Sequence, residues 1–149
     1  MQQSEYLQVT MGKFIFRVPE GCLYTEAGLW VSRDADTGLA RIGLSDFRQQ
    51  SSGDVAFVEL PAVGQAVKSG EELASVETVK VDLEVPAPFD AAVVATNEAL
   101  ADAPELINQD PYGAGWLVEL KPAAWSAAGL MDAQAYLEVM TAQAEEASK

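Results

Sequence analysis

The chain has 149 residues, 49% of them hydrophobic, and 23 acidic residues against 9 basic ones give a net charge of -14. These values predict one soluble domain without a membrane span, and they argue against nucleic acid or an anionic membrane as a partner. Basic protein surfaces are the expected counterparts, although an acidic surface also favours solubility without any partner. The lack of histidine excludes most hydrolase triads and most zinc sites.

The N-terminus and the cysteine content indicate a reducing compartment. The segment Met1–Tyr6 has neither the basic start nor the apolar stretch of a secretory signal, so we expect a cytoplasmic protein. The single cysteine, Cys22, can form no internal disulfide and is expected to behave as a buried small hydrophobic side chain.

Short segments rich in β-branched and aromatic residues recur along the chain, each bounded by turn residues. Between two of them, Ser45 can cap a helical turn that reaches Gln50, and Gly64 and Gly70 frame a further short strand. Residues 34–38, Asp-Ala-Asp-Thr-Gly, resemble the start of a calcium loop but lack its spacer and final glutamate, so we expect a strand-connecting turn and assign no metal. The predicted strands are residues 13–18, 29–33, 39–44, 55–60, 73–78, 79–85, 91–96 and 116–120.

Helices are predicted mainly in the second half. Residues 103–107 indicate a brief helix with Pro104 in its first turn, whereas residues 97–100 continue the pattern of turns and short strands. Helical spacing after Asp132 predicts a C-terminal helix at about 131–146, with fraying over the last few residues. Its apolar face consists of Ala133, Tyr136, Leu137, Met140 and Ala144.

These elements predict a mainly β fold: a flattened sandwich or barrel with short helices and a C-terminal helix. Residues 1–149 are expected to form a single domain with its core at about 14–121. We expect Gly113 and Gly115 in turns that need a permissive backbone. The large aromatic residues are expected in the core or against turns; they are Trp30, Phe57, Tyr112, Trp116 and Trp125.

One lysine stands at a break in the strand pattern. Val76 and Thr78 fall on even positions, whereas Val79 and Val81 fall on odd ones. Side chains alternate faces along a strand, so this change of phase predicts a turn or bulge with Lys80 exposed at the bend. A lysine among valines is by itself typical of a solvated strand, and this stretch alone assigns no function.

Several separated motifs resemble the H protein of the glycine cleavage system over about residues 14–140. They keep the family's spacing without an insertion, which makes them far more specific than the lysine segment alone. The motifs are Gly64, Gly70, Glu77-Thr78-Val79-Lys80, Asn97-Glu98-Ala99-Leu100, Ala103-Pro104-Glu105-Leu106-Ile107-Asn108 and Asp110-Pro111-Tyr112-Gly113-Ala114-Gly115-Trp116-Leu117.

The resemblance implies a hammerhead-like lipoyl domain in which Lys80 carries lipoic acid in an amide bond, as N6-lipoyllysine. It also implies that Glu77 contributes to recognition by the lipoylating enzyme. Biotinyl domains typically place methionines on both sides of their lysine, where this chain has Val79 and Val81, so biotin is the less favoured cofactor. Such a protein is a non-catalytic carrier, because the reactive chemistry belongs to the cofactor.

The implied partners are a lipoate-protein ligase or lipoyl synthesis enzymes, and a lipoamide dehydrogenase. Two pathways stay open: glycine cleavage, in which the arm carries an aminomethyl group from glycine decarboxylase to aminomethyltransferase, and sulfur oxidation, in which it carries a sulfur-linked intermediate for a heterodisulfide-reductase-like complex. An unmodified binding or scaffold protein with the same fold is a further alternative.

Two segments depart from the family pattern around the arm. Ala27-Gly28-Leu29 stands where many H proteins have a histidine and an acidic residue before the tryptophan that corresponds to Trp30. Residues 81–91 clearly keep only the second proline, Pro88, of the family's segment after the lysine. These departures put glycine cleavage itself in question and keep the sulfur pathway open.

Overall fold

The computed structural model describes residues 5–147; the fraying expected at the C-terminus falls mainly on residues 148–149, outside that range. The strands are β1 (Tyr6–Met11), β2 (Phe14–Pro19), β3 (Leu23–Tyr24), β4 (Leu29–Arg33), β5 (Ala40–Leu44), β6 (Val55–Glu59), β7 (Ala66–Val67), β8 (Glu72–Thr78), β9 (Asp82–Pro86), β10 (Ala91–Thr96) and β11 (Val118–Pro122). The helices are α1 (Asp46–Ser52), α2 (Leu106–Gln109), α3 (Ala133–Ala147) and a short 3-10 helix, η1 (Glu98–Ala101).

Two antiparallel sheets form the body of the molecule. One has the strand order β3-β4-β5-β11-β10-β7 and the other β6-β8-β9. Their inner faces share one hydrophobic core, to which Ile42 and Leu120 contribute from the first sheet and Val76 and Val85 from the second. Burying these alternating apolar positions stabilises the pair of sheets. The predicted mainly β fold is confirmed.

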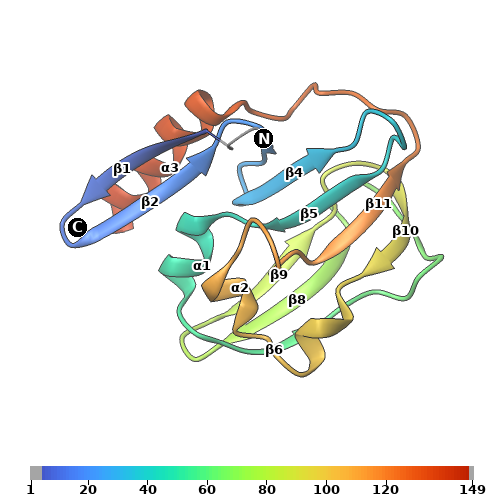
Figure 1. Cartoon of the computed structure of the whole chain (residues 1–149), viewed down its shortest axis with the longest axis horizontal. Coiled ribbons are helices and arrows are strands. Elements are labelled where there is room, and N and C mark those ends of the chain that lie inside the picture. The colour runs from blue at the N-terminus through green and yellow to red at the C-terminus, as the bar shows by residue number, and fades with distance from the viewer. Residues whose placement is uncertain (1–4, 148–149) are drawn as a thin grey trace.

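The β1–β2 hairpin and α3 form a separate layer to one side of the sheets (Figure 1). Phe16 and Val18 point inward from β2 and pack with Tyr136 and Met140 of α3 in a second hydrophobic cluster. The ring of Tyr136 stacks on Tyr24 with the centroids 4.7 Å apart. Every residue of the predicted helix face belongs to this cluster, so the amphipathic pattern correctly identified the packed side of α3.

Helix α1 joins the two layers. As predicted, the hydroxyl of Ser45 caps it by accepting from the backbone N–H of Arg48 at 3.2 Å. The same hydroxyl lies 2.8 Å from the hydroxyl of Tyr136, and this buried contact ties α1 to α3. The phenol of Tyr112 accepts from the N–H of Asp46 at 2.9 Å and donates to the carbonyl of Arg17 in β2 at 2.7 Å.

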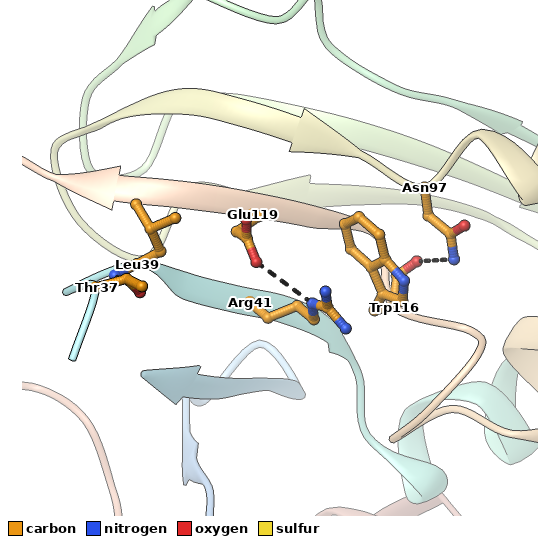
Figure 2. Close-up of polar contacts among 6 residues, drawn as sticks. All are labelled: Thr37, Leu39, Arg41, Asn97, Trp116 and Glu119. Atoms are coloured by element: carbon orange, nitrogen blue, oxygen red, sulfur yellow. Dashed lines mark hydrogen bonds and ion pairs between the residues drawn. The ribbon is translucent and has the colours of Figure 1, made fainter. Parts of the chain in front are cut away.

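Residues 97–100 are not a turn and short strand as expected. Asn97 caps the 3-10 helix η1 by accepting from the N–H of Ala99 at 3.3 Å. Its amide donates to the carbonyls of Ala114 at 2.7 Å and Trp116 at 2.8 Å, the second of which Figure 2 shows. A side chain that satisfies three backbone groups outweighs the strand preference of the neighbouring residues.

Trp116 lies beside the β5–β11 pair, where its environment is partly polar. The guanidinium of Arg41 lies 4.3 Å from the centre of the Trp116 indole and 3.6 Å from the carboxylate of Glu119 (Figure 2). The Trp116 indole also packs against the second hydrophobic cluster and is half-buried, so the prediction of a packed aromatic residue is confirmed at this position.

The prediction for Phe57 was wrong, because this side chain is 54% exposed. The β6–β8 register shifts between Val55 and Phe57, and the shift turns the ring outward. For Gly113 and Gly115 the reason was wrong, because neither has a positive φ. A Cβ atom at Gly113 would lie 2.5 Å from the Asp110 carboxylate. A Cβ atom at Gly115 would lie 2.5 Å from the carbonyl of Leu106, so close packing favours glycine at both positions. Strands β1 and β3 were not predicted.

Candidate functional site

Lys80 lies in the tight turn that joins β8 to β9, as the change of strand phase predicted. The N–H of Thr78 donates to the carbonyl of Val81 at 2.9 Å and closes the turn. The hydroxyl of Thr78 accepts from the N–H groups of Val81 at 2.9 Å and Lys80 at 3.2 Å. One side chain therefore fixes two consecutive residues of the turn, Lys80 and Val81. Residues 79–81 are not part of the strand expected over 79–85.

The segment between α1 and β6 supports the turn from the other side. The hydroxyl of Thr78 reaches the carbonyl of Ser52 at 2.6 Å, and the N–H of Val79 donates to the carbonyl of Asp54 at 2.9 Å. Between them, Gly53 has a φ of +94°, and a Cβ atom at this position would lie 3.5 Å from the Cβ atom of Lys80. The residues that link α1 to β6 therefore also hold the backbone of the lysine turn.

Asn108 of α2 holds that supporting segment in place. Its side-chain oxygen accepts from the N–H of Val55 at 2.9 Å, and its amide donates to the carbonyl of Gly53 at 3.1 Å and to the Gln49 side chain at 3.0 Å. The motif residue Asn108 therefore acts on Lys80 through the α1–β6 segment. Sequence reasoning included Asn108 in a motif but did not predict this connection.

The side chain of Lys80 is exposed, and its ammonium donates to the carbonyl of Ser51 at 3.2 Å. Within residues 5–147 the single ion pair joins Arg41 and Glu119, so Lys80 forms none there. The preceding Val79 is 77% exposed. The amine is consequently accessible to a modifying enzyme, with an exposed apolar side chain next to it.

Two carboxylates lie at the base of the turn. Glu77 at the end of β8 lies directly opposite Asp82 at the start of β9, and both side chains are exposed. Like charges on directly opposed strand residues repel each other. The structure therefore brings the predicted recognition residue Glu77 next to the lysine turn, in an arrangement that fold stability alone would not favour.

The titratable groups with shifted pKa values are buried hydroxyl and thiol groups outside residues 77–82. Burial raises the pKa of the Cys22 thiol to about 11 and raises the pKa values of Tyr24, Tyr112 and Tyr136. These groups are neutral at physiological pH and serve packing and hydrogen bonding. Cys22 was expected to be a buried small hydrophobic side chain. It is only partly buried, so this expectation is confirmed only in part.

Residues 34–38, which resemble the start of a calcium loop but were predicted to be a strand-connecting turn, form a structural turn. The carboxylate of Asp34 accepts from the N–H groups of Asp36 at 2.8 Å and Thr37 at 3.3 Å, which confirms the strand-connecting turn. Across the described part of the chain, no three cysteine, aspartate or glutamate side chains are arranged to hold a metal ion. No helix there is long and apolar enough to cross a membrane.

The chain matches the family model described as "Glycine cleavage H-protein" over residues 22–143. A glycine cleavage system H protein of Thermus thermophilus is 42% identical over 128 residues, which cover 85% of this chain and 98% of the relative. The corresponding protein of Bacteroides thetaiotaomicron is 40% identical, covering 82% of this chain and 96% of the relative.

A solved structure leads to the same family. The crystal structure of a glycine cleavage system H protein from Mycobacterium marinum matches with a TM-score of 0.72 at 36% sequence identity, covering 80% of this chain and 95% of that one. The similarity in sequence and in fold extends over most of the chain and includes the lysine turn, which lies within residues 22–143. The chain therefore belongs to the glycine cleavage H-protein family.

Proposed function

We propose that this protein is a cytoplasmic lipoyl carrier in which lipoic acid is amide-linked to Lys80, and that residues 1–149 act as one carrier domain. The observation that carries the proposal is the position of Lys80: exposed, free of ion pairs within residues 5–147, and presented by a turn that two segments fix. A lysine that was merely a solvated strand residue would not need a turn fixed by hydrogen bonds to a second segment of the chain. The amine fits an amide linkage, since an amide nitrogen keeps one N–H for the carbonyl of Ser51.

When bound, lipoic acid supplies a cyclic disulfide that can be reduced, opened and loaded. The chain itself presents and orients this group. The Thr78 hydroxyl bonds the N–H of Lys80, and the carbonyl of Asp54 accepts from the N–H of Val79, so the reach of the arm comes mainly from rotation of side-chain bonds. Acylation removes the charge of Lys80 and leaves Glu77 and Asp82 as an acidic surface that favours docking to basic enzymes.

We propose glycine cleavage as the pathway, with an aminomethyl group as cargo and glycine decarboxylase, aminomethyltransferase and lipoamide dehydrogenase as partners. The support is the family itself and the names of the relatives given above. A lipoate-protein ligase or lipoyl synthesis enzymes would attach the arm, with Glu77 in the surface that they recognise.

One observation favours the sulfur-oxidising pathway as a second candidate. Many H proteins carry an acidic residue at the position of Leu29, which here is 1% exposed and part of the hydrophobic core. The neighbouring Gly28 is buried against the side chain of Arg48. This segment therefore offers no carboxylate to a cationic cargo, and a sulfur-linked cargo for a heterodisulfide-reductase-like complex needs none.

A reconstituted assay tests the carrier function and separates the two pathways. The lipoylated protein is combined with purified glycine decarboxylase, aminomethyltransferase, lipoamide dehydrogenase, tetrahydrofolate and NAD. We expect glycine-dependent NADH formation with the wild type and none with Lys80→Arg. A lipoylated protein that gives no NADH, in a mixture active with a known H protein, contradicts glycine cleavage and favours the second candidate.

A further inference from the structure

A groove of about 860 Å³ opens beside Lys80, between the β1–β2 hairpin, α1 and the last turns of α3. Its volume falls within the range of sites that hold small organic groups. Phe14, Phe16 and Phe47 form one side of it, with Gln50, Lys80 and Ala144 also among the residues that line it. The lysine is thus part of the groove itself.

The phenylalanine rings on one side of the groove pack against one another, and one of them remains exposed to solvent. The rings of Phe14 and Phe16 stack with their centroids 6.0 Å apart, and Phe47 meets Phe16 edge-on at 5.2 Å. Phe14 is nevertheless 47% exposed. An exposed aromatic side chain on the wall of a groove presents apolar surface that an occupant could cover.

Phe14 and Phe16 of this wall come from the part of the chain that the family model does not match, whereas Phe47 lies within the match. The match covers residues 22–143, whereas β1, β2 and the turn between them end at Pro19. Two contacts hold the hairpin against the rest of the molecule: the Phe16 ring packs on Phe47 of α1, and the hydroxyl of Tyr112 donates a hydrogen bond to the carbonyl of Arg17. The hairpin is therefore a structured addition to the family domain at the side where Lys80 lies.

The Lys80 side chain already points along this surface. Its ammonium donates to the carbonyl of Ser51, which also lines the groove. A charged ammonium is costly to move onto apolar surface, but an amide nitrogen lacks the charge and can keep the bond to Ser51. Acylation therefore removes the obstacle to placing an extended apolar group along the phenylalanine wall.

We propose that the β1–β2 hairpin forms a holding site for the acylated side chain of Lys80, in which the hydrocarbon chain and dithiolane of the lipoyl group lie against Phe14 and Phe16. This inference rests on the proposed function, because it requires lipoylation of Lys80. Apolar burial and contacts between sulfur and aromatic rings both favour this position. The hairpin then determines how far the arm is exposed to solvent between encounters with partners.

The test measures how fast a soluble phosphine reduces the dithiolane of fully lipoylated protein, with alkylation and peptide mapping to count the two new thiols. Phe14→Ser removes the exposed part of the wall. Phe57→Ser is the matched control, because Phe57 is similarly exposed (54% against 47%) and does not line the groove. We expect reduction about fivefold faster for Phe14→Ser than for the wild type, and an unchanged rate for Phe57→Ser.

A second measurement follows the aromatic ring signals of Phe14 and Phe16 by NMR in lipoylated and unmodified protein. We expect both to shift on lipoylation while the Phe57 signal stays in place. Equal reduction rates in all three lipoylated proteins, or unchanged ring signals, overturn the holding site and leave the carrier function standing. A protein whose mass shows no lipoyl group on Lys80 overturns the carrier function and the holding site together.

Discussion

Thr78 gives Lys80 its defined position, because its single hydroxyl contacts Lys80 and Val81 in the turn and the carbonyl of Ser52 behind it. A threonine within a β strand is ordinary in sequence, so nothing distinguished this residue beyond its place in the Glu77-Thr78-Val79-Lys80 motif. The phase change predicted the bend correctly, since it depends only on alternation along the strand. The partner of Thr78 in α1, the carbonyl of Ser52, could not be predicted from local pattern.

Thr78→Val keeps the shape of the side chain and removes the hydroxyl. We expect a loss of about 1–3 kcal/mol in unfolding free energy, because the N–H groups of Lys80 and Val81 lose their acceptor. Lipoylation by the ligase should also slow, since the turn is no longer fixed. Urea unfolding and a ligation time course measure the two effects. Thr96→Val in β10 is the control, and equal effects at both positions contradict the assigned role.

Glu77→Gln tests whether the carboxylate serves recognition. We expect about 3- to 10-fold slower lipoylation, because a basic enzyme surface loses one charge beside the acceptor. Stability should stay constant or rise slightly, since the repulsion from Asp82 is relieved. Initial ligation rates and urea midpoints provide the comparison, with Glu72→Gln at the far end of β8 as the control. An unchanged ligation rate would remove Glu77 from the recognition surface.

At the scale of elements, the predictions succeeded where a periodic pattern reports packing and failed where side chains act on the backbone. The strand at 91–96 and the face of α3 were predicted because alternating or helical apolar spacing mirrors burial. The strand at 29–33 was predicted from its strand-forming residues and is buried over Leu29–Val31 without alternation. Residues 97–100 were missed because Asn97 satisfies backbone groups far away in sequence. Strand β1 is an exception: Leu7, Val9 and Met11 alternate with more exposed residues, so the alternation was present in the sequence and was overlooked.

Helix α2 contributes to the site through one side chain, and Asn108→Ala tests this role. We expect a loss of about 2–4 kcal/mol in unfolding free energy, because the N–H of Val55 and the carbonyl of Gly53 lose their partner behind the lysine turn. Chemical denaturation measures the loss, and Gln109→Ala on the exposed neighbouring position is the control. A loss below that of Gln109→Ala would show that α2 does not support the turn.

At the scale of the whole molecule, the chain combines a family domain with an added hairpin and a strongly acidic surface. The net charge of -14 and the carboxylates around the lysine turn agree with a carrier that visits several basic partners in succession. The hairpin and α3 enclose a second core that depends on buried hydroxyl groups, among them those of Tyr24 and Tyr136. This second core determines how the molecule responds to alkaline conditions.

Stability is expected to fall at high pH. Burial raises the pKa of Cys22 to about 11 and raises those of Tyr24, Tyr112 and Tyr136, so the folded protein keeps these groups protonated. In the unfolded chain they ionise near pH 8.5 and 10, so their stabilising contribution is complete below about pH 8.5 and is lost progressively above it. Each group contributes a slope of about 1.4 kcal/mol per pH unit where it titrates only in the unfolded state.

Urea midpoints measured from pH 7 to 11 test this behaviour. We expect a constant midpoint up to about pH 8.5 and a decline that steepens above pH 10. Tyr24→Phe removes one of the groups and should make the decline shallower. A midpoint that rises between pH 9 and 11 would contradict the assignment of these groups as buried and protonated.

The most direct test of the carrier function is the intact mass of the protein, with peptide mapping across Lys80, after production with lipoate and the source organism's own lipoylating enzymes. We expect one lipoyl group, confined to Lys80, and none in a Lys80→Arg variant that unfolds at the same urea concentration as the wild type. An unmodified Lys80, in a preparation where the same enzymes lipoylate a known acceptor, would contradict the carrier function and favour an unmodified scaffold protein.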